Sequence, residues 1–261
     1  MTAPLTTGYY EEYLEAIRTH WWFRGRERVL EAIVPPLIPL TGEAVIADVG
    51  SGPGGPARVL FPHGYLIAMD VSPTPLQAYA SASARVAADA VRVPCQSGRI
   101  SVVCAFDVLE HLDDDEVALH EWKRLLRPGG WLVMTVPAYQ LLWSAHDDVN
   151  GHRRRYRAGP LKQLLAVAGF RVIRLTYFNT MLLPCVAAVR WTGRLFSAGS
   201  PKPVSPSNNH LDCQMRFPSW IERSCEEALK LEARWLRRGN LRMGVSICAI
   251  ARAEAARPSG C

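Results

Sequence analysis

The sequence predicts an α/β fold in which a seven-stranded, mostly parallel sheet carries helices on both faces. Short apolar segments alternate with helix-compatible stretches along most of the 261 residues, and this rhythm is typical of a parallel sheet. The chain is also 49% hydrophobic and 21% charged, which supplies enough apolar material for a real core. That balance excludes a disordered tail protein and a collagen-like fibre.

Each predicted strand is a short apolar run bounded by turn residues. The first run ends in a glycine-rich turn, and the second ends in an acid. A helix is expected from about residue 116 to residue 126, where Pro128, Gly129 and Gly130 stop it. In chain order, the strands are expected at residues 44–49, 65–70, 84–88, 100–106, 131–136, 171–177 and 244–251.

The alternation breaks between residues 179 and 240, where apolar helical pieces flank a linker rich in Ser, Pro, Gly and Asn at 197–209. We expect a helical cap there, inserted before the last strand and lying over one end of the sheet. An alternative is a helical subdomain whose apolar face only covers the sheet or makes a dimer contact. The chain is therefore divided into an N-terminal helical lid at 1–40, a core at 41–178, the cap at 179–240, and the last strand with a C-terminal tail at 241–261.

Charge and cysteine content indicate the setting in which the protein works. Its 30 Lys and Arg against 24 Asp and Glu give a net charge of +6, which suits an anionic ligand, a membrane surface or nucleic acid. The 7 cysteines are scattered without a CxxC pair, which argues against a zinc cluster or a disulfide framework. The N-terminus lacks the pattern of a secretory signal, and the apolar run at 181–189 is too short to span a membrane. We expect a cytoplasmic protein with no transmembrane segment.

The first predicted strand leads into the turn Asp48-Val49-Gly50-Ser51-Gly52-Pro53-Gly54-Gly55. Glycines there let a ligand approach the backbone closely, because they lack a Cβ atom and tolerate positive φ. Gly50, Gly52 and Gly55 also satisfy the dinucleotide pattern GxGxxG, and Asp70 ends the next strand, where an acid holds ribose hydroxyls. A nicotinamide cofactor is therefore one hypothesis.

Other features favour a different cofactor. Asp48 is an acid inside the end of the first strand, and Asp89 follows the third strand. Further on, the chain reads Leu109-Glu110-His111-Leu112 and then Leu126-Arg127-Pro128-Gly129-Gly130. Over about residues 40–180 the chain thus resembles the class I S-adenosylmethionine (SAM) dependent methyltransferases. Their motifs read D/E-x-G-x-G-x-G, an acid ending the second strand, an acid after the third, "LEHL", and "LRPGG" before the fifth.

The resemblance implies a Rossmann-like core with SAM as cofactor. It implies that Gly50 and Gly52 pass beneath the methionyl part of SAM, and that Asp48 orders this loop. It further implies that Asp70 binds both ribose hydroxyls, Asp89 the adenine N6, and that Phe106 lies near the methyl group. The expected cofactor-binding residues are Arg24, Asp48, Gly50, Ser51, Gly52, Asp70, Val71, Asp89, Ala90 and Phe106. As an alternative, Asp48, Asp89 and His111 are ordinary turn or capping residues, with His111 capping the following helix.

An aromatic segment with two arginines, residues 20–26, precedes the first strand. In small-molecule methyltransferases a similar segment forms a lid over SAM, and Arg24 or Arg26 would then pair with the cofactor carboxylate. The alternative is that Trp21, Trp22 and Phe23 pack an N-terminal helix on the core.

The loop after the fifth strand, residues 137–157, is rich in histidine, tyrosine and arginine and is expected to form the acceptor side of the site. For an oxygen or carbon acceptor, His152 or His146 is the candidate base and Tyr156 its orienter. A metal site of His146, Asp147 and His152 is a less favoured alternative, so no metal is expected. The basic run at 153–157 is also open to phosphate binding, but no extended basic stripe accompanies it, and we expect no nucleic-acid partner.

These features predict a SAM-dependent methyltransferase that acts on oxygen, nitrogen or carbon of a small acceptor, in specialised metabolism. The apolar cap indicates an apolar or aromatic acceptor. The alternatives are an RNA or protein methyltransferase, and an NAD-binding oxidoreductase or non-catalytic nucleotide-binding module. A homodimer is compatible with the apolar cap.

Overall fold

A computed structural model describes residues 15–40, 43–188, 190 and 217–254, with the side chain of His146 left out. Within that part, no helix has the length and apolar character needed to cross a membrane. The linker expected at 197–209 lies outside the described residues. The division of the chain into lid, core, cap and tail remains a prediction.

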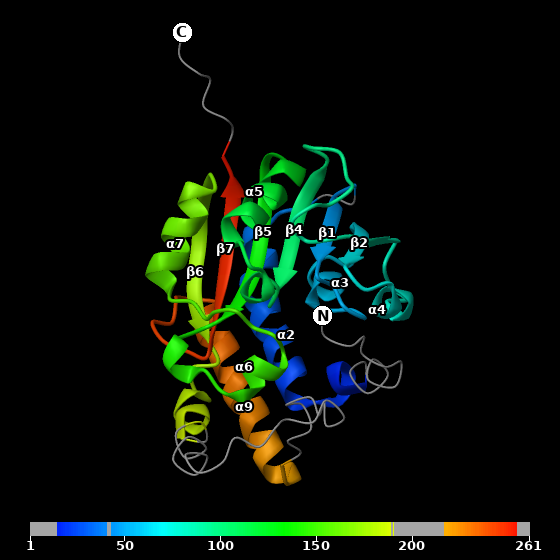
Figure 1. Cartoon of the computed structure of the whole chain (residues 1–261). Coiled ribbons are helices and arrows are strands. Elements are labelled where there is room, and N and C mark those ends of the chain that lie inside the picture. The colour runs from blue at the N-terminus through cyan, green and yellow to red at the C-terminus, as the bar shows by residue number, and fades with distance from the viewer. Residues whose placement is uncertain (1–14, 41–42, 189, 191–216, 255–261) are drawn as a thin grey trace.

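A seven-stranded sheet forms the centre of the molecule, with the order β3-β2-β1-β4-β5-β7-β6 (Figure 1). Neighbours from β3 to β5 are parallel, whereas β7 runs antiparallel to both β5 and β6. The predicted mostly parallel α/β sheet is therefore confirmed. The strands are β1 (Val45–Val49), β2 (Tyr65–Asp70), β3 (Ala84–Ala87), β4 (Ile100–Phe106), β5 (Leu126–Pro137), β6 (Phe170–Phe178) and β7 (Ser246–Ala253).

The start of β5 departs from the prediction. Helix α5 (Asp115–Leu125) begins after the N-cap Asp114 and ends one residue earlier than expected, because Leu126 is already extended and pairs with Ile100. The register between β4 and β5 then shifts before Val102 pairs with Trp131. The Pro-Gly-Gly sequence thus lies in an irregular opening of the strand instead of ending the helix.

Helices cover both faces of the sheet. On one face, α5 and α7 (Ala158–Val167) contribute Leu119, Trp122 and Leu161 to a large buried cluster. On the other, α2 (Trp21–Ile33), α3 (Pro56–Leu60) and α4 (Pro73–Ala78) contribute Leu30 and others to a second cluster. Other elements are α6 (Ala145–Val149), α9 (Ser219–Leu236) and the short 3-10 helices η1 (Pro35–Leu37), η2 (Leu109–His111) and η3 (Gln140–Leu142).

The inserted segment before β7 contributes α9, which lies mainly beyond the end of the sheet where the parallel strands finish, next to the start of α2 (Figure 1). Only its last turns, through Ala233 and Leu236, join the cluster under the sheet. Farther out, Leu229 packs with Trp21 and Leu182 in a small separate cluster. The aromatic segment at 20–26 thus begins a helix that packs on the core, and Trp21 also contacts the inserted segment.

A glycine sets how closely α2 and α9 approach each other. A Cβ atom on Gly25 would lie 2.1 Å from Cδ1 and 3.1 Å from Cβ of Leu229, a fully buried side chain. Helix propensity alone predicts that Gly25→Ala stabilises the protein by roughly 0.5–1 kcal/mol. We expect the opposite, because overpacking should lower the free energy of unfolding by about 1–3 kcal/mol. Unfolding by denaturant measures this change. In the Leu229→Ala background the same change should lose its cost, and equal costs in both backgrounds would contradict this account.

Candidate active site

The turn after β1 opens the site at the edge where the parallel strands end. Gly50 and Gly52 have φ of +63° and +54°, which side chains rarely adopt. A Cβ on Gly50 would meet Val108 at 2.6 Å, so this position also lacks room for a side chain. A Cβ on Gly52 would have no neighbour within 4 Å. The backbone at Gly52 is therefore open to a ligand.

Asp70 ends β2 directly beside this turn. Its Oδ2 accepts a hydrogen bond of 2.9 Å from the Gly52 amide, and its Oδ1 accepts one of 2.9 Å from the Ser72 amide. A carboxylate has about four acceptor positions, so both oxygens retain capacity for further donors. The next residue, Val71, is 76% exposed. Ser51 is buried in the turn, and its amide donates to the carbonyl of Met69.

Asp48 is buried at the end of β1. The Tyr79 hydroxyl donates to its Oδ2 at 3.3 Å. Burial raises the pKa of Asp48 to about 7, and the nearby Asp70 charge adds to the rise, while the Tyr79 hydrogen bond opposes it. The side chain thus connects β1 to the end of α4.

The turn after β3 carries two more of the expected cofactor-binding residues. Oδ1 of Asp89 accepts a hydrogen bond of 3.0 Å from the Val91 amide, which is the geometry of an Asx turn. The carbonyl of Ala90 accepts from the indole N–H of Trp122 at 3.0 Å, which holds the turn against α5. The exposed Asp89 side chain lies at the same edge of the sheet as Asp70.

Beyond β4, an ion pair links the sheet to α2. Asp107 follows Phe106 with a φ of +56°, a strained conformation for a residue other than glycine. Its Oδ2 lies 2.7 Å from Arg26, and its Oδ1 accepts from the Thr135 hydroxyl at 2.9 Å. Arg24 instead pairs with Glu226 of α9 at 2.7 Å. Of the two arginines considered from the sequence, Arg26 is the one that lies at the strand ends.

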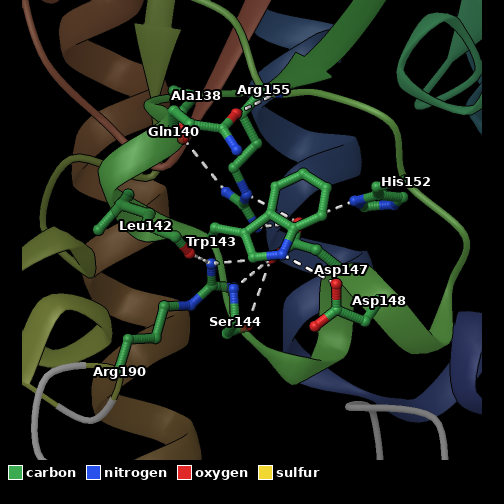
Figure 2. A network of polar contacts seen from close by, with 10 residues as sticks. All are labelled: Ala138, Gln140, Leu142, Trp143, Ser144, Asp147, Asp148, His152, Arg155 and Arg190. Carbon is green, nitrogen blue, oxygen red and sulfur yellow. Dashed lines mark hydrogen bonds and ion pairs between the residues drawn. The ribbon is translucent and has the colours of Figure 1, made fainter. Parts of the chain in front are cut away.

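The loop after β5 is organised around Asp147, which is fully buried (Figure 2). Its Oδ1 lies 2.8 Å from His152 Nδ1 and 2.7 Å from Nε of Arg155, and its Oδ2 accepts from the Ser144 amide at 2.8 Å. Arg190 lies 3.7 Å from the same carboxylate. Burial would raise the pKa of Asp147, but the His152 hydrogen bond and the Arg155 charge outweigh it and hold this pKa well below its usual range.

Tyr156 anchors the same loop to the core. Its hydroxyl donates to Asp115 Oδ2 at 3.2 Å and lies 3.4 Å from the Leu109 carbonyl. Burial and the Asp115 charge raise the pKa of the tyrosine. The side chain of His146 lies outside the described part. In the basic run, Arg153, Arg154 and Arg155 pair with Asp113, Asp115 and Asp147. Such internal pairing does not favour a phosphate-binding surface.

Two residues of the "LEHL" block approach this loop. Glu110 is 1% exposed, and burial together with the Asp107 charge raises its pKa well above its usual range. The His111 ring meets the His152 ring edge to face, with centroids 4.7 Å apart. His111 has an exposed edge, yet packing and the neighbouring His152 lower its pKa to about 4. It does not cap the next helix, because Asp114 occupies that position.

Comparison with known proteins identifies this architecture. Residues 47–134 match the family described as "Methyltransferase domain". Residues 47–134 are thus similar to a methyltransferase domain, and curated relatives of the chain are named SAM-dependent methyltransferases. The match begins inside β1 and ends inside β5, so the glycine turn, Asp70, Asp89 and the "LEHL" block all lie within the methyltransferase domain.

Relatives extend the likeness beyond the methyltransferase domain. A malonyl-(acyl-carrier protein) O-methyltransferase of Dechloromonas aromatica is 31% identical over 137 residues, which are 49% of this chain and 52% of that protein. A probable SAM-dependent methyltransferase of Mycobacterium tuberculosis is 29% identical over 157 residues, or 58% of this chain and 56% of the relative. The chain thus spans about half the length of these curated relatives. Among solved structures, a complex between the Haloferax volcanii Trm112 methyltransferase activator and a methyltransferase matches with a TM-score of 0.60, 15% identity and 96% of both chains, a likeness of fold.

The methyltransferase domain brings most expected residues to one edge of the sheet, and two groups were not expected from the sequence. Asp107 was missed although it precedes the "LEHL" block, and a positive φ is invisible in a sequence. The cluster of Glu110, His111 and His152 was missed because His152 comes from a different loop than Glu110 and His111. The nearness of both loops to the ends of adjacent strands was the available signal.

Proposed function

We propose that the chain is an enzyme that transfers the methyl group of SAM to a small-molecule acceptor. The observation that carries this proposal is the hydrogen bond between Asp70 and the Gly52 amide. It joins the acid that ends β2 to the open glycine turn after β1, inside the segment that matches the methyltransferase family. An anionic acceptor of hydrogen bonds beside an open backbone suits a ribose next to a methionyl chain.

The sheet order supports SAM over a nicotinamide cofactor. The dinucleotide-binding fold has the strand order 3-2-1-4-5-6. Here a seventh strand, antiparallel to its neighbours, is inserted between β5 and β6. The strand order of this sheet thus differs from that of the dinucleotide-binding fold, although its glycine turn also satisfies the pattern GxGxxG.

The proposed cofactor contacts follow the edge of the sheet. Gly50 and Gly52 lie beneath the methionyl part with Ser51, and Asp48 orders the loop from within the core. Asp70 binds the ribose hydroxyls next to Val71. We assign Asp89 and Ala90 to the adenine end of SAM. We assign Phe106 to the region of the methyl group. For the cofactor carboxylate, Arg26 is better placed than Arg24, which is engaged by Glu226.

The proposed reaction is an in-line displacement. An electron pair of the acceptor forms a bond to the methyl carbon, and the carbon–sulfur bond breaks with its pair left on the sulfur of S-adenosylhomocysteine. Holding acceptor, carbon and sulfur in line supplies several kcal/mol. An oxygen acceptor must also lose a proton, and we assign the loss of this proton to the region around His152. An uncharged amine acceptor has no such need before the transfer.

The acceptor is proposed to be small and apolar or aromatic, because the inserted segment carries exposed apolar side chains, among them Met181 and Trp220. A role in specialised metabolism and a cytoplasmic location are part of the same proposal. The cysteines in the described part are unpaired, in keeping with a reducing compartment.

Calorimetric titration with SAM, S-adenosylhomocysteine and NAD tests the proposal before any acceptor is known. Binding of the first two ligands without NAD is the expected result. Replacing Asp70 by asparagine should weaken SAM binding by about 10- to 100-fold, because a hydrogen bond to a charged group contributes roughly 1.5–3 kcal/mol. The matched control is Asp113→Asn, which removes a carboxylate that is 87% exposed and should leave the affinity unchanged. NAD binding alone, or equal affinities in both variants, would overturn the assignment.

A further inference from the structure

Three potential metal ligands meet beside the proposed acceptor side of the site. Glu110 and His111 belong to η2, after β4, and His152 belongs to the loop after α6. Each offers one ligand atom, and the three atoms all lie within 4.8 Å of one another. The cluster therefore consists of one carboxylate oxygen and two imidazole nitrogens from separate parts of the chain.

Glu110 is the member of the cluster that points to a missing ligand. Its side chain is 1% exposed, and neither carboxylate oxygen has a hydrogen-bond partner among the described residues. Taking a carboxylate out of water without a partner costs several kcal/mol, and buried charges in proteins are normally paired or bound to a metal. A cation beside Glu110 would supply the missing partner.

Both histidines make hydrogen bonds to outer partners, as metal-binding histidines usually do. Nδ1 of His152 lies 2.8 Å from Asp147, a carboxylate that Arg155 and Ser144 keep in place. The ring of His111 makes a hydrogen bond with the backbone of Asn150. An outer carboxylate or carbonyl of this kind fixes the tautomer and orientation of a ligating imidazole. Asp147 therefore acts as an outer partner of His152, because its own oxygens are occupied by these donors.

We propose that Glu110, His111 and His152 bind one divalent first-row transition-metal ion. Two imidazoles and one carboxylate suit such ions, and three protein ligands leave coordination positions open. Two atoms that are each about 2.1 Å from one cation are at most about 4.2 Å apart. Binding would therefore draw the three ligand atoms closer together than their present spacing. The exposed edge of His111 gives the ion a path from solvent.

The open positions of this ion would take an oxygen atom of the acceptor, an assignment that rests on the proposed function. A bound cation lowers the pKa of a coordinated hydroxyl. The acceptor would then lose its proton to solvent, its oxygen would attack the methyl carbon, and the carbon–sulfur bond would break. In this arrangement His152 serves as a ligand, and the proton needs no side-chain base. The acceptor class is a hydroxyl compound, such as a phenol or an enol.

Metal retention tests the site independently of activity. The purified full chain is loaded with Co²⁺, dialysed against metal-free buffer and analysed for bound metal. Wild type should retain about one Co²⁺ per chain, whereas Glu110→Gln and His152→Gln should lose it. The matched control is His120→Gln on the exposed side of α5, which should retain the metal. Cys185→Ser, at an exposed thiol, tests whether cysteine binds the ion instead.

The outcomes separate the two proposals. No retention by wild type, equal retention by all variants, or loss only in Cys185→Ser would overturn the metal site. Binding of S-adenosylhomocysteine by each variant shows that it is folded, since none of these residues is assigned to the cofactor. Metal retention without SAM binding by wild type would leave the metal site standing and overturn the methyltransferase proposal.

Discussion

Replacing Asp147 by alanine is expected to lower the free energy of unfolding by about 3–5 kcal/mol. The carboxylate is fully buried and binds Arg155, whose side chain is only 3% exposed. Removing it leaves the buried guanidinium without this ion-pair partner. It also removes the acceptor for the Ser144 amide and the partner of His152 (Figure 2). The loss should appear in denaturant unfolding followed by circular dichroism.

The neighbouring Asp148 provides the control for this experiment. It is exposed, and its Oδ1 accepts a hydrogen bond of 3.0 Å from the indole of Trp143 at the surface. Asp148→Ala should change the free energy of unfolding by less than about 1 kcal/mol. A similar small change for Asp147→Ala would mean that Arg155 finds another partner, and that the carboxylate does not organise the loop. Asp147→Asn keeps the shape but removes the charge, so it should also be strongly destabilised.

Much of the sheet was predictable because buried parallel strands are nearly continuous apolar runs. The strands at 65–70 and 100–106 were predicted with the observed bounds. The start of β5 was not, because Leu126 becomes extended only through its pairing with Ile100 on a neighbouring strand. Considered alone, Pro-Gly-Gly predicts the end of a helix. The register between two strands depends on both of them, so a single segment does not determine it.

The same distinction between local features and contacts with other segments applies to the candidate site. The glycine turn and Asp70 were singled out from the sequence because their roles depend on backbone freedom and on a position at a strand end. The contacts between individual side chains could not be predicted from the sequence. Arg26 contacts Asp107 and Arg24 contacts Glu226 only because α2 crosses the sheet with one face toward β4 and another toward α9. Likewise, the meeting of Glu110 with His152 depends on how the loop after α6 folds back over η2.

Asp48 should make the protein less stable as the pH rises from acid to neutral. Its pKa is about 7 in the folded chain against 3.8 for an ordinary aspartate, because the side chain is fully buried. Between these two values the folded state binds more protons than the unfolded state, so the free energy of unfolding falls with rising pH. Below the lower value the carboxyl is neutral in both states and contributes nothing. Above the higher value the full cost is present and constant.

Asp48→Asn isolates this contribution, because asparagine remains neutral and still accepts the Tyr79 hydroxyl. At roughly 1.4 kcal/mol per pKa unit, the difference in stability between wild type and variant should change by about 3 kcal/mol between pH 5 and pH 8, in favour of the variant at pH 8. Denaturant unfolding of both proteins at the two pH values measures it, with Asp113→Asn as the exposed control. Titrating groups that do not interact with Asp48 act equally in wild type and variant, so their contributions cancel. Parallel stability curves would mean that Asp48 is ionised in the folded protein throughout, held by a donor stronger than the Tyr79 hydroxyl.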